Sequence, residues 1–212
     1  MKTIKRLIWR KFSKSLAAIV LVFAWAQMAS FSEPAEKMSR FSLSFSAGCY
    51  LPQQKSFRQL YGSVQFPLNL QVNYVLSPQA DLFAGLRYLT SKGETEIVGP
   101  ELVLESHPLD FGLYSGRLGI CYYFLRTRLS LFMGAGLSYN FYKETWENTE
   151  ISSEDKKSGF FAQAGTEYLL GKKYSVVGRI EYSSIPTKES SKLQKKINLG
   201  GLEFSVGLVL KF

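Results

Sequence analysis

Residues 202–212, LEFSVGLVLKF, give the clearest indication of how this chain folds. Apolar residues occupy every second position, with mostly polar or small residues between them; the apolar set is Leu202, Phe204, Val206, Leu208, Leu210 and Phe212. A period of two predicts a β-strand with one apolar and one polar face. Barrel strands of a bacterial outer membrane show this alternation, apolar toward lipid and polar toward the lumen. Because strands of soluble proteins rarely end a chain on an unpaired aromatic residue, the stretch favours a membrane barrel.

The N-terminal region predicts export. An apolar run at residues 16–25 follows a basic segment formed by Lys2, Lys5, Arg6, Arg10, Lys11 and Lys14. Ala24-Trp25-Ala26 then offers a cleavage site, so residues 1–26 are expected to be a signal peptide, cut after Ala26 or a few residues later, near Ala29. A retained anchor is the alternative, although the run is shorter than the ~20 residues of a spanning helix.

Removal of the signal peptide lowers the net charge of the protein. Six basic residues and no acidic ones leave with residues 1–26, so the formal net charge falls from +9 to +3. A nucleic-acid partner therefore loses its support. The two cysteines belong to opposite faces of strands that are not neighbours, Cys49 toward lipid and Cys121 toward the lumen. We expect two separate residues rather than a disulfide.

Eight alternating segments follow a short periplasmic lead-in at residues 27–40. They are residues 41–49, 68–76, 82–90, 109–124, 129–141, 160–170, 174–184 and 197–212. Tight turns around Pro78, Arg126 and Lys172 alternate with long connections at residues 51–62, 91–108, 143–157 and 185–196. The order predicts an all-β, transmembrane, antiparallel up-and-down barrel over residues 41–212, with short periplasmic turns and long extracellular loops.

The predicted register places the outward aromatic residues in two girdles, as amphipathic rings prefer at membrane interfaces. The periplasmic girdle is Phe41, Tyr74, Tyr122, Tyr168 and Phe212, and the outer girdle is Tyr88, Tyr114, Tyr139, Phe141, Phe160 and Tyr182. A soluble eight-stranded barrel with an apolar interior is the alternative, which the signal peptide, terminal Phe and girdles disfavour.

The lumen face gathers six charged residues, three of each sign: Arg87, Arg117, Arg179, Glu167, Glu181 and Glu203. An eight-stranded barrel is just wide enough for side chains to fill. We therefore expect an ion-pair network that plugs the interior, with a narrow polar path as the alternative.

Catalytic, cofactor-binding and metal-binding residues are not expected. The single histidine, His107, follows Glu105 and Ser106 in a long connection and precedes a proline, whereas nucleophilic catalysis needs a base within hydrogen-bond reach of a hydroxyl. Charges in the long connections are unevenly distributed, with a net −3 at residues 91–108 and a net +3 at residues 185–196. Basic loops there would meet lipopolysaccharide phosphates, and acidic ones could share divalent cations.

The chain resembles the small eight-stranded outer-membrane barrels of the OmpA/OmpX-like group. The residues that carry the resemblance are the signal peptide, the loop order, Gly165-Thr166-Glu167-Tyr168 and the C-terminal LEFSVGLVLKF. It implies an outer-membrane monomer that contacts outer-membrane lipid and lipopolysaccharide, and whose surface loops serve adhesion, ligand binding or envelope integrity. It also implies that the barrel-assembly machinery reads the terminal strand through Phe204, Val206, Leu208, Leu210 and Phe212. A narrow channel for small or apolar solutes and a lipid A-modifying enzyme are the alternatives.

Overall fold

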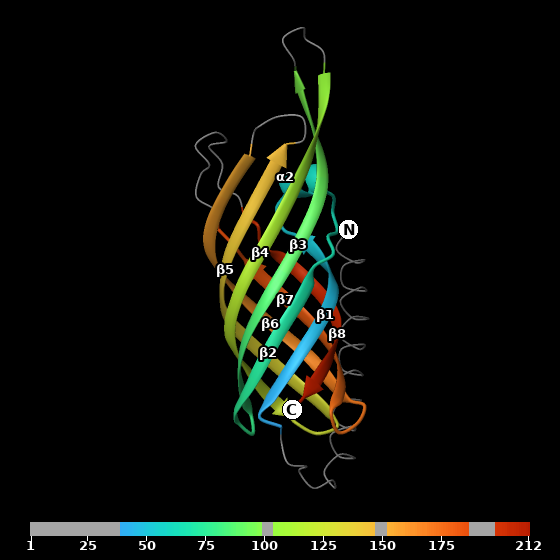
Figure 1. The fold of residues 1–212 in the computed structure, drawn as a ribbon, viewed down its shortest axis with the longest axis vertical. Helices are drawn as coiled ribbons and strands as arrows, with labels where there is room; N and C mark the ends of the chain where they lie inside the picture. The colour runs from blue at the N-terminus through green and yellow to red at the C-terminus, as the bar shows by residue number, and fades with distance from the viewer. Residues whose placement is uncertain (1–38, 99–103, 147–151, 187–197) are drawn as a thin grey trace, which may run out of the picture. The chain divides into compact units, whose positions relative to one another are not determined.

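A computed structural model describes residues 39–98, 104–146, 152–186 and 198–212. Eight strands form a closed antiparallel barrel in which each strand pairs with its sequence neighbours and the first pairs with the last (Figure 1). The strands are β1 Phe41–Pro52, β2 Leu68–Ser77, β3 Ala80–Val98, β4 Leu104–Leu125, β5 Leu129–Trp146, β6 Ser152–Leu169, β7 Tyr174–Ser184 and β8 Gly201–Lys211. The predicted fold is confirmed. The expected signal peptide, residues 1–26, and nearly all of the lead-in at residues 27–40 lie outside the described residues.

Closure of the barrel fixes which face of each strand meets lipid. Leu43 pairs with Leu210, and Cys49 pairs with Phe204, so the apolar sets of β1 and β8 share the outer face. Phe204, Val206 and Leu208 of β8 are exposed, and Phe212, just after the strand, reaches 66% exposure. Leu202 and Leu210 on the same face are half-buried. Ten of the eleven predicted girdle aromatics are also exposed, and the eleventh, Phe141, is half-buried. A slip of one residue would have reversed these faces, so the predicted register is confirmed.

Four strands run far beyond the outer girdle, contrary to the expected loops at residues 91–108 and 143–157. β2 pairs with β3 only as far as Leu68 and Tyr88, and β7 pairs with β6 only as far as Ser184 and Phe160. β3, β4, β5 and β6 continue past these points as a twisted sheet, visible at the top of Figure 1. The inner face of these extensions is buried at Leu89, Leu109 and Phe111, where helix α2, Lys55–Tyr61, covers it. Residues 91–98, 104–108, 143–146 and 152–157 are mostly polar, so no continuous period-two apolar pattern marks them as strands.

A helix occupies the first long connection, which was expected to be a loop at residues 51–62. α2, Lys55–Tyr61, buries Phe57 and Tyr61, which are four residues apart and therefore lie on one face. It ends at Gly62, whose φ of 87° is the left-handed conformation that favours glycine, and the Gly62 N–H donates to the Arg58 carbonyl. Within the described residues, no helix is long and apolar enough to cross a membrane.

Inward aromatic rings lie over glycines of neighbouring strands. A Cβ added to Gly119 would stand 2.7 Å from the ring of Phe83, and one added to Gly165 would stand 2.6 Å from the ring of Phe132. Such contacts are too short for a side chain. The glycines therefore provide the space in which a narrow barrel holds aromatic residues in its lumen.

Candidate functional site

The lumen consists of alternating polar and apolar layers. Along β3, the inward residues run from Asp81 at the periplasmic end through Phe83 to Arg87 and Leu89. The lower apolar layer contains Phe83, Cys121, Tyr123, Phe132, Phe161, Val177 and Val209. The charged middle lies above it, and a second apolar cluster closes the outer end. Strand alternation sets each of these inward positions.

The charged middle contains two buried ion pairs. Arg87 Nη2 lies 3.1 Å from Glu203 Oε2, and both residues are only 2% exposed. Asn69 donates to the other Glu203 oxygen at 2.7 Å. Arg117 donates to both oxygens of Glu181, at 2.8 and 2.6 Å, in the bidentate geometry that favours arginine over lysine. These pairs link β3 to β8 and β4 to β7 across the lumen.

The remaining two residues of the expected network do not pair with each other. Arg179 donates to the Ser44 hydroxyl at 2.8 Å, and no ion pair to a carboxylate is found for it among the described residues. Glu167 lies near the periplasmic mouth, where Lys211 Nζ is 2.6 Å from its Oε1. The expected set of six thus faces the lumen but divides between two levels. Lys211 was missed as a partner, although the alternation in β8 already placed it on the lumen face.

Aromatic rings hold two of these guanidinium groups in place. Arg87 Cζ lies 4.3 Å from the ring centroid of Tyr50, and Arg117 Cζ lies 5.2 Å from that of Phe161. Cation–π contact stabilises arginine in a site with little water. The Nε atoms of both arginines have no hydrogen-bond partner among the described residues.

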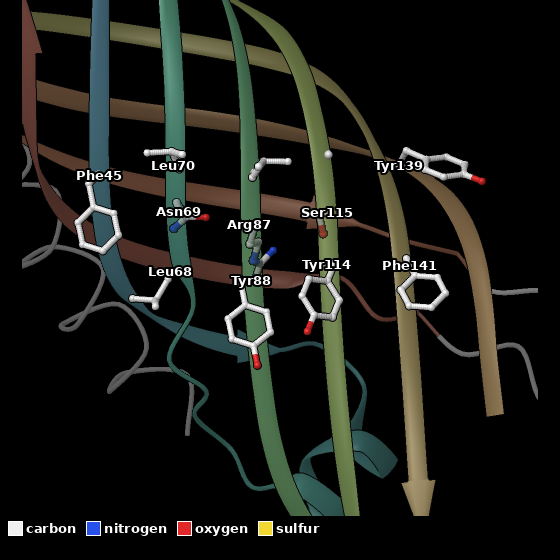
Figure 2. A pocket seen from close by; sticks show the side chains of 12 residues that line it. Phe45, Leu68, Asn69, Leu70, Arg87, Tyr88, Tyr114, Ser115, Tyr139 and Phe141 are labelled. Atoms are coloured by element: carbon white, nitrogen blue, oxygen red, sulfur yellow. The ribbon is translucent and has the colours of Figure 1, made fainter. Parts of the chain in front are cut away.

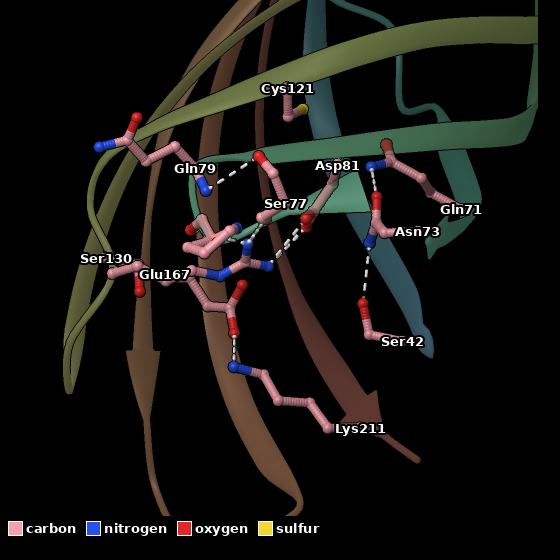
Figure 3. Close-up of polar contacts among 12 residues, drawn as sticks. Ser42, Gln71, Asn73, Ser77, Gln79, Asp81, Cys121, Ser130, Glu167 and Lys211 are labelled. Atoms are coloured by element: carbon pink, nitrogen blue, oxygen red, sulfur yellow. Dashed lines mark hydrogen bonds and ion pairs between the residues drawn. The ribbon is translucent and has the colours of Figure 1, made fainter. Parts of the chain in front are cut away.

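A second polar cluster closes the periplasmic mouth (Figure 3). Arg126 donates to both oxygens of Asp81 at 2.9 and 2.7 Å, and its Cζ lies 4.2 Å from the ring centroid of Tyr123. Asn73 donates to the Ser42 hydroxyl at 3.0 Å. The Asp81–Arg126 pair was not predicted because Arg126 belongs to a turn, where no periodicity shows the direction of a side chain.

An apolar cap closes the outer end of the lumen. We use the term outer cap for the buried residues Tyr50, Phe57, Tyr61, Leu89, Leu109, Phe111, Leu113 and Ile185. The Phe57 and Phe111 rings meet edge to face with centroids 5.0 Å apart, and the Ser91 hydroxyl donates to the Tyr61 carbonyl at 3.1 Å. Helix α2 is thereby held inside the barrel mouth. This cap was missed at the sequence level.

A small charged cluster lies beside the outer cap. Lys157 Nζ is 2.6 Å from Asp155 Oδ2, and the Tyr142 hydroxyl donates to the same oxygen at 3.4 Å. The hydrogen bond from Lys157 lowers the pKa of Asp155 below its ordinary value. Burial, with a smaller contribution from the Asp155 charge, raises the pKa of Tyr142 to about 12. The Asp155 carboxylate is therefore charged and the Tyr142 hydroxyl neutral at neutral pH.

The other candidate residues take simpler positions. Cys49 is exposed and Cys121 is buried, and both are free thiols. The backbone of His107 pairs with that of Thr95, while its side chain lies outside the described part of the structure. Across the described residues, no three histidine, cysteine or carboxylate side chains converge in a way that could hold a metal ion.

Comparison with known proteins agrees with this geometry. The family model for the outer membrane protein beta-barrel domain matches residues 15–212. The chain belongs to this family. It is a protein of the outer membrane. Comparison with curated proteins gives no significant match.

Solved structures of outer-membrane barrels are similar in fold. Neisserial surface protein A is 20% identical with a TM-score of 0.59, covering 84% of this chain and 100% of its own. OprG from Pseudomonas aeruginosa is 13% identical with a TM-score of 0.61, covering 84% of this chain and 98% of its own. A major outer membrane protein from Thermus thermophilus is 14% identical with a TM-score of 0.52, covering 81% of this chain and 99% of its own. At these identities the likeness shows the fold alone.

Proposed function

We propose that this barrel is a non-enzymatic surface protein that binds an extracellular partner and does not conduct solutes. Its binding surface is the outer sheet, by which we mean the parts of β3–β6 beyond the outer girdle: residues 89–98, 104–113, 142–146 and 152–159. The long sheet is the observation that carries the proposal, since a barrel that only spans the membrane has no use for it.

The length of the outer sheet supports an extracellular role. β3 continues for residues 89–98 past the girdle residue Tyr88, which is roughly 30 Å of strand at ~3.4 Å per residue. The lipid-side face of the outer sheet carries the charged residues Lys92, Asp110 and Lys143, from β3, β4 and β5. Charged residues on the lipid-side face of a sheet are unfavourable in the hydrocarbon layer, so this part is proposed to stand above the membrane.

The side chains that fill the lumen support the proposal that the barrel does not conduct solutes. Two buried ion pairs, an aromatic layer and the outer cap succeed one another along the barrel axis, and each depends on side chains from opposite walls. A solute path would require several of these layers to separate at once. The channel alternative is therefore the less favoured one.

A shortened hairpin tests the binding proposal. Replacing residues 94–108 by Asn-Gly joins Gly93 to Leu109, which are partners in register, through a two-residue turn suited to a hairpin. Cells that display the native protein should adhere to at least one of the coats fibronectin, laminin and heparin, and the shortened variant should lose that adhesion. Equal adhesion of the two variants, or no adhesion above that of cells without the protein, would contradict the proposal.

A conductance measurement tests the second half. Both the native and the shortened protein should give no current above background in a planar lipid bilayer. Reproducible single-channel steps from the native protein would favour the channel alternative instead.

A further inference from the structure

The lipid-facing surface has a groove at the outer girdle, separate from the outer sheet. It encloses about 400 Å³ and is lined mainly by outward apolar side chains. We use the term girdle groove for the surface between Leu70, Leu86, Tyr88, Tyr114, Gly116 and Phe141 (Figure 2). Its volume lies in the range of small-molecule sites, although it opens to the side rather than into the lumen.

Gly116 creates the depression. It is an outward position of β4, and its partners in register are Leu86 on β3 and Tyr139 on β5. Both partners carry large exposed side chains, so the glycine leaves a gap between them. A Cβ at Gly116 would meet only the Tyr139 carbonyl oxygen, at an ordinary 3.9 Å. Backbone packing therefore does not require glycine at this position, so the gap at Gly116 is available for a ligand.

The position of the groove selects the class of ligand. Its upper wall is formed by Tyr88 and Tyr114, whose ring centroids are 4.9 Å apart. Figure 2 shows both hydroxyls pointing toward the end of the barrel that carries α2, which is the outer end. Tyrosines at a membrane interface keep the ring in the apolar layer and the hydroxyl at headgroup level. The floor of the groove below them therefore faces acyl chains of the outer leaflet.

A cation stands at the headgroup end of the groove. Lys156 on β6 is in register with the groove residue Phe141, and its Nζ lies 6.0 Å from the centroid of that ring. Lys143 follows two residues beyond Phe141 on the same face, in register with Glu154. Farther along, Lys92 forms a 3.8 Å ion pair with Asp110. Among Lys143, Lys156 and Glu154, positive charge exceeds negative charge by one, which favours an anionic headgroup.

From these observations we infer that the girdle groove binds one molecule of a phosphorylated glycolipid of the outer leaflet, the lipid A portion of lipopolysaccharide. One acyl chain lies over Gly116 between Leu86 and Tyr139, and a phosphate meets Lys156 beside Phe141. The apolar floor with its cation at headgroup level carries this assignment. It is independent of the partner proposed for the outer sheet.

Native mass spectrometry of the full-length protein in mild detergent tests the inference. The probes are bisphosphorylated lipid A, dephosphorylated lipid A and phosphatidylglycerol. The native protein should retain one bisphosphorylated lipid A and retain phosphatidylglycerol less well. Gly116→Leu fills the groove and should lower the retained lipid A about tenfold, the change expected when part of an acyl chain loses its apolar contacts in the groove. Lys156→Gln should lower it about two- to fivefold for the bisphosphorylated form only, as expected for one exposed ion pair.

Gly178→Leu is the matched control. Gly178 is an outward glycine of β7, far around the barrel, and a Cβ there would meet only the Thr166 hydroxyl at 3.8 Å. This variant should retain lipid A as the native protein does, and heat-modifiable mobility on gels checks that each variant is folded. Equal retention by Gly116→Leu and native protein would overturn the inference, as would equal binding of phosphatidylglycerol. A dimer that Gly116→Leu converts to a monomer without any retained lipid A would assign the groove to a second copy of the chain instead.

Discussion

The charged middle of the lumen and the outer cap both close the barrel, but they are built in opposite ways. In the middle, Arg117 and Glu181 come from facing strands, and their backbone positions are fixed by the barrel. In the cap, Phe57 comes from helix α2 in a loop and reaches Phe111 of the wall. The charged middle is built from the barrel strands themselves, whereas the outer cap depends on a helix outside the strands.

The two closures contribute differently to the stability of the protein. Separating the middle pairs leaves charges buried beside Phe161 and other lumen side chains, which costs about 3–5 kcal/mol for each uncompensated charge. Displacing α2 exposes apolar rings to water near the mouth and leaves all eight strands paired. We therefore expect the middle to report global unfolding and the cap to report local opening.

Breaking the Arg117–Glu181 pair should have the largest effect. Arg117→Ala leaves the Glu181 carboxylate buried without its bidentate partner and should lower the free energy of unfolding by about 3–5 kcal/mol. Urea unfolding of the protein in lipid vesicles measures this.

The double variant Arg117→Met with Glu181→Leu is the control. Removing both charges while keeping side-chain volume should restore most of the lost stability, since apolar replacements of buried pairs are often neutral or stabilising. A double variant as unstable as Arg117→Ala would mean that packing, rather than an unpaired charge, causes the loss.

Phe57→Ala should weaken the cap and leave the barrel intact. Loss of the ring removes about 1.5–3 kcal/mol of burial, which corresponds to a roughly 10- to 100-fold larger open population of α2. Trypsin cleavage at Lys55 and Arg58 should accelerate by that factor, while the urea midpoint stays near the native value. A midpoint shift as large as that of Arg117→Ala would show that the cap is part of the global folding unit.

The same difference explains which parts of the structure the sequence predicts. Strand alternation placed Arg87, Arg117 and Glu203 on the lumen face because every second residue of a paired strand shares a side. It could not assign partners. Register across three or more strands decides that Arg179 meets Ser44 and that Glu167 meets Lys211.

Elements without a period-two pattern were missed for a related reason. α2 has only seven residues, and its two buried aromatics gain their energy from Phe111, far away in the sequence. Such a short helix is marginal in isolation, so local sequence carries little signal for it. Residues 91–98, 104–108, 143–146 and 152–157 of the outer sheet were likewise taken for loops, because their mostly polar sequence carries no apolar alternation.

Deletion of Phe212 compares a ring on the lipid face with a ring in the cap. Phe212 is 66% exposed, and its N–H donates to the Phe41 carbonyl at 2.9 Å, at the seam between β8 and β1. Its loss should cost at most about 1.5–3 kcal/mol in the folded barrel. If the terminal strand is an assembly signal, the variant should insert poorly in cells and yet refold into lipid vesicles. Normal insertion in cells would refute the signal.

Asp155→Asn should have the smallest effect on stability, and it tests whether Asp155 influences Tyr142 beside the outer cap. The pKa of Asp155 is lowered by Lys157, so its stabilisation is present above the ordinary carboxyl pKa and is lost as pH falls through the folded value. The pKa of Tyr142 is raised to about 12, so its contribution is present below the ordinary phenol pKa of about 10 and is lost as pH rises toward 12. Since the pair is half-exposed, we expect a loss of about 0.2–1 kcal/mol near neutral pH. Ultraviolet titration of tyrosinate should show the pKa of Tyr142 falling without Asp155 but staying above its ordinary value, because burial is the larger cause. An unchanged pKa of Tyr142 would contradict the expected contribution of Asp155 and would leave burial beside Phe111 as the cause of the raised pKa.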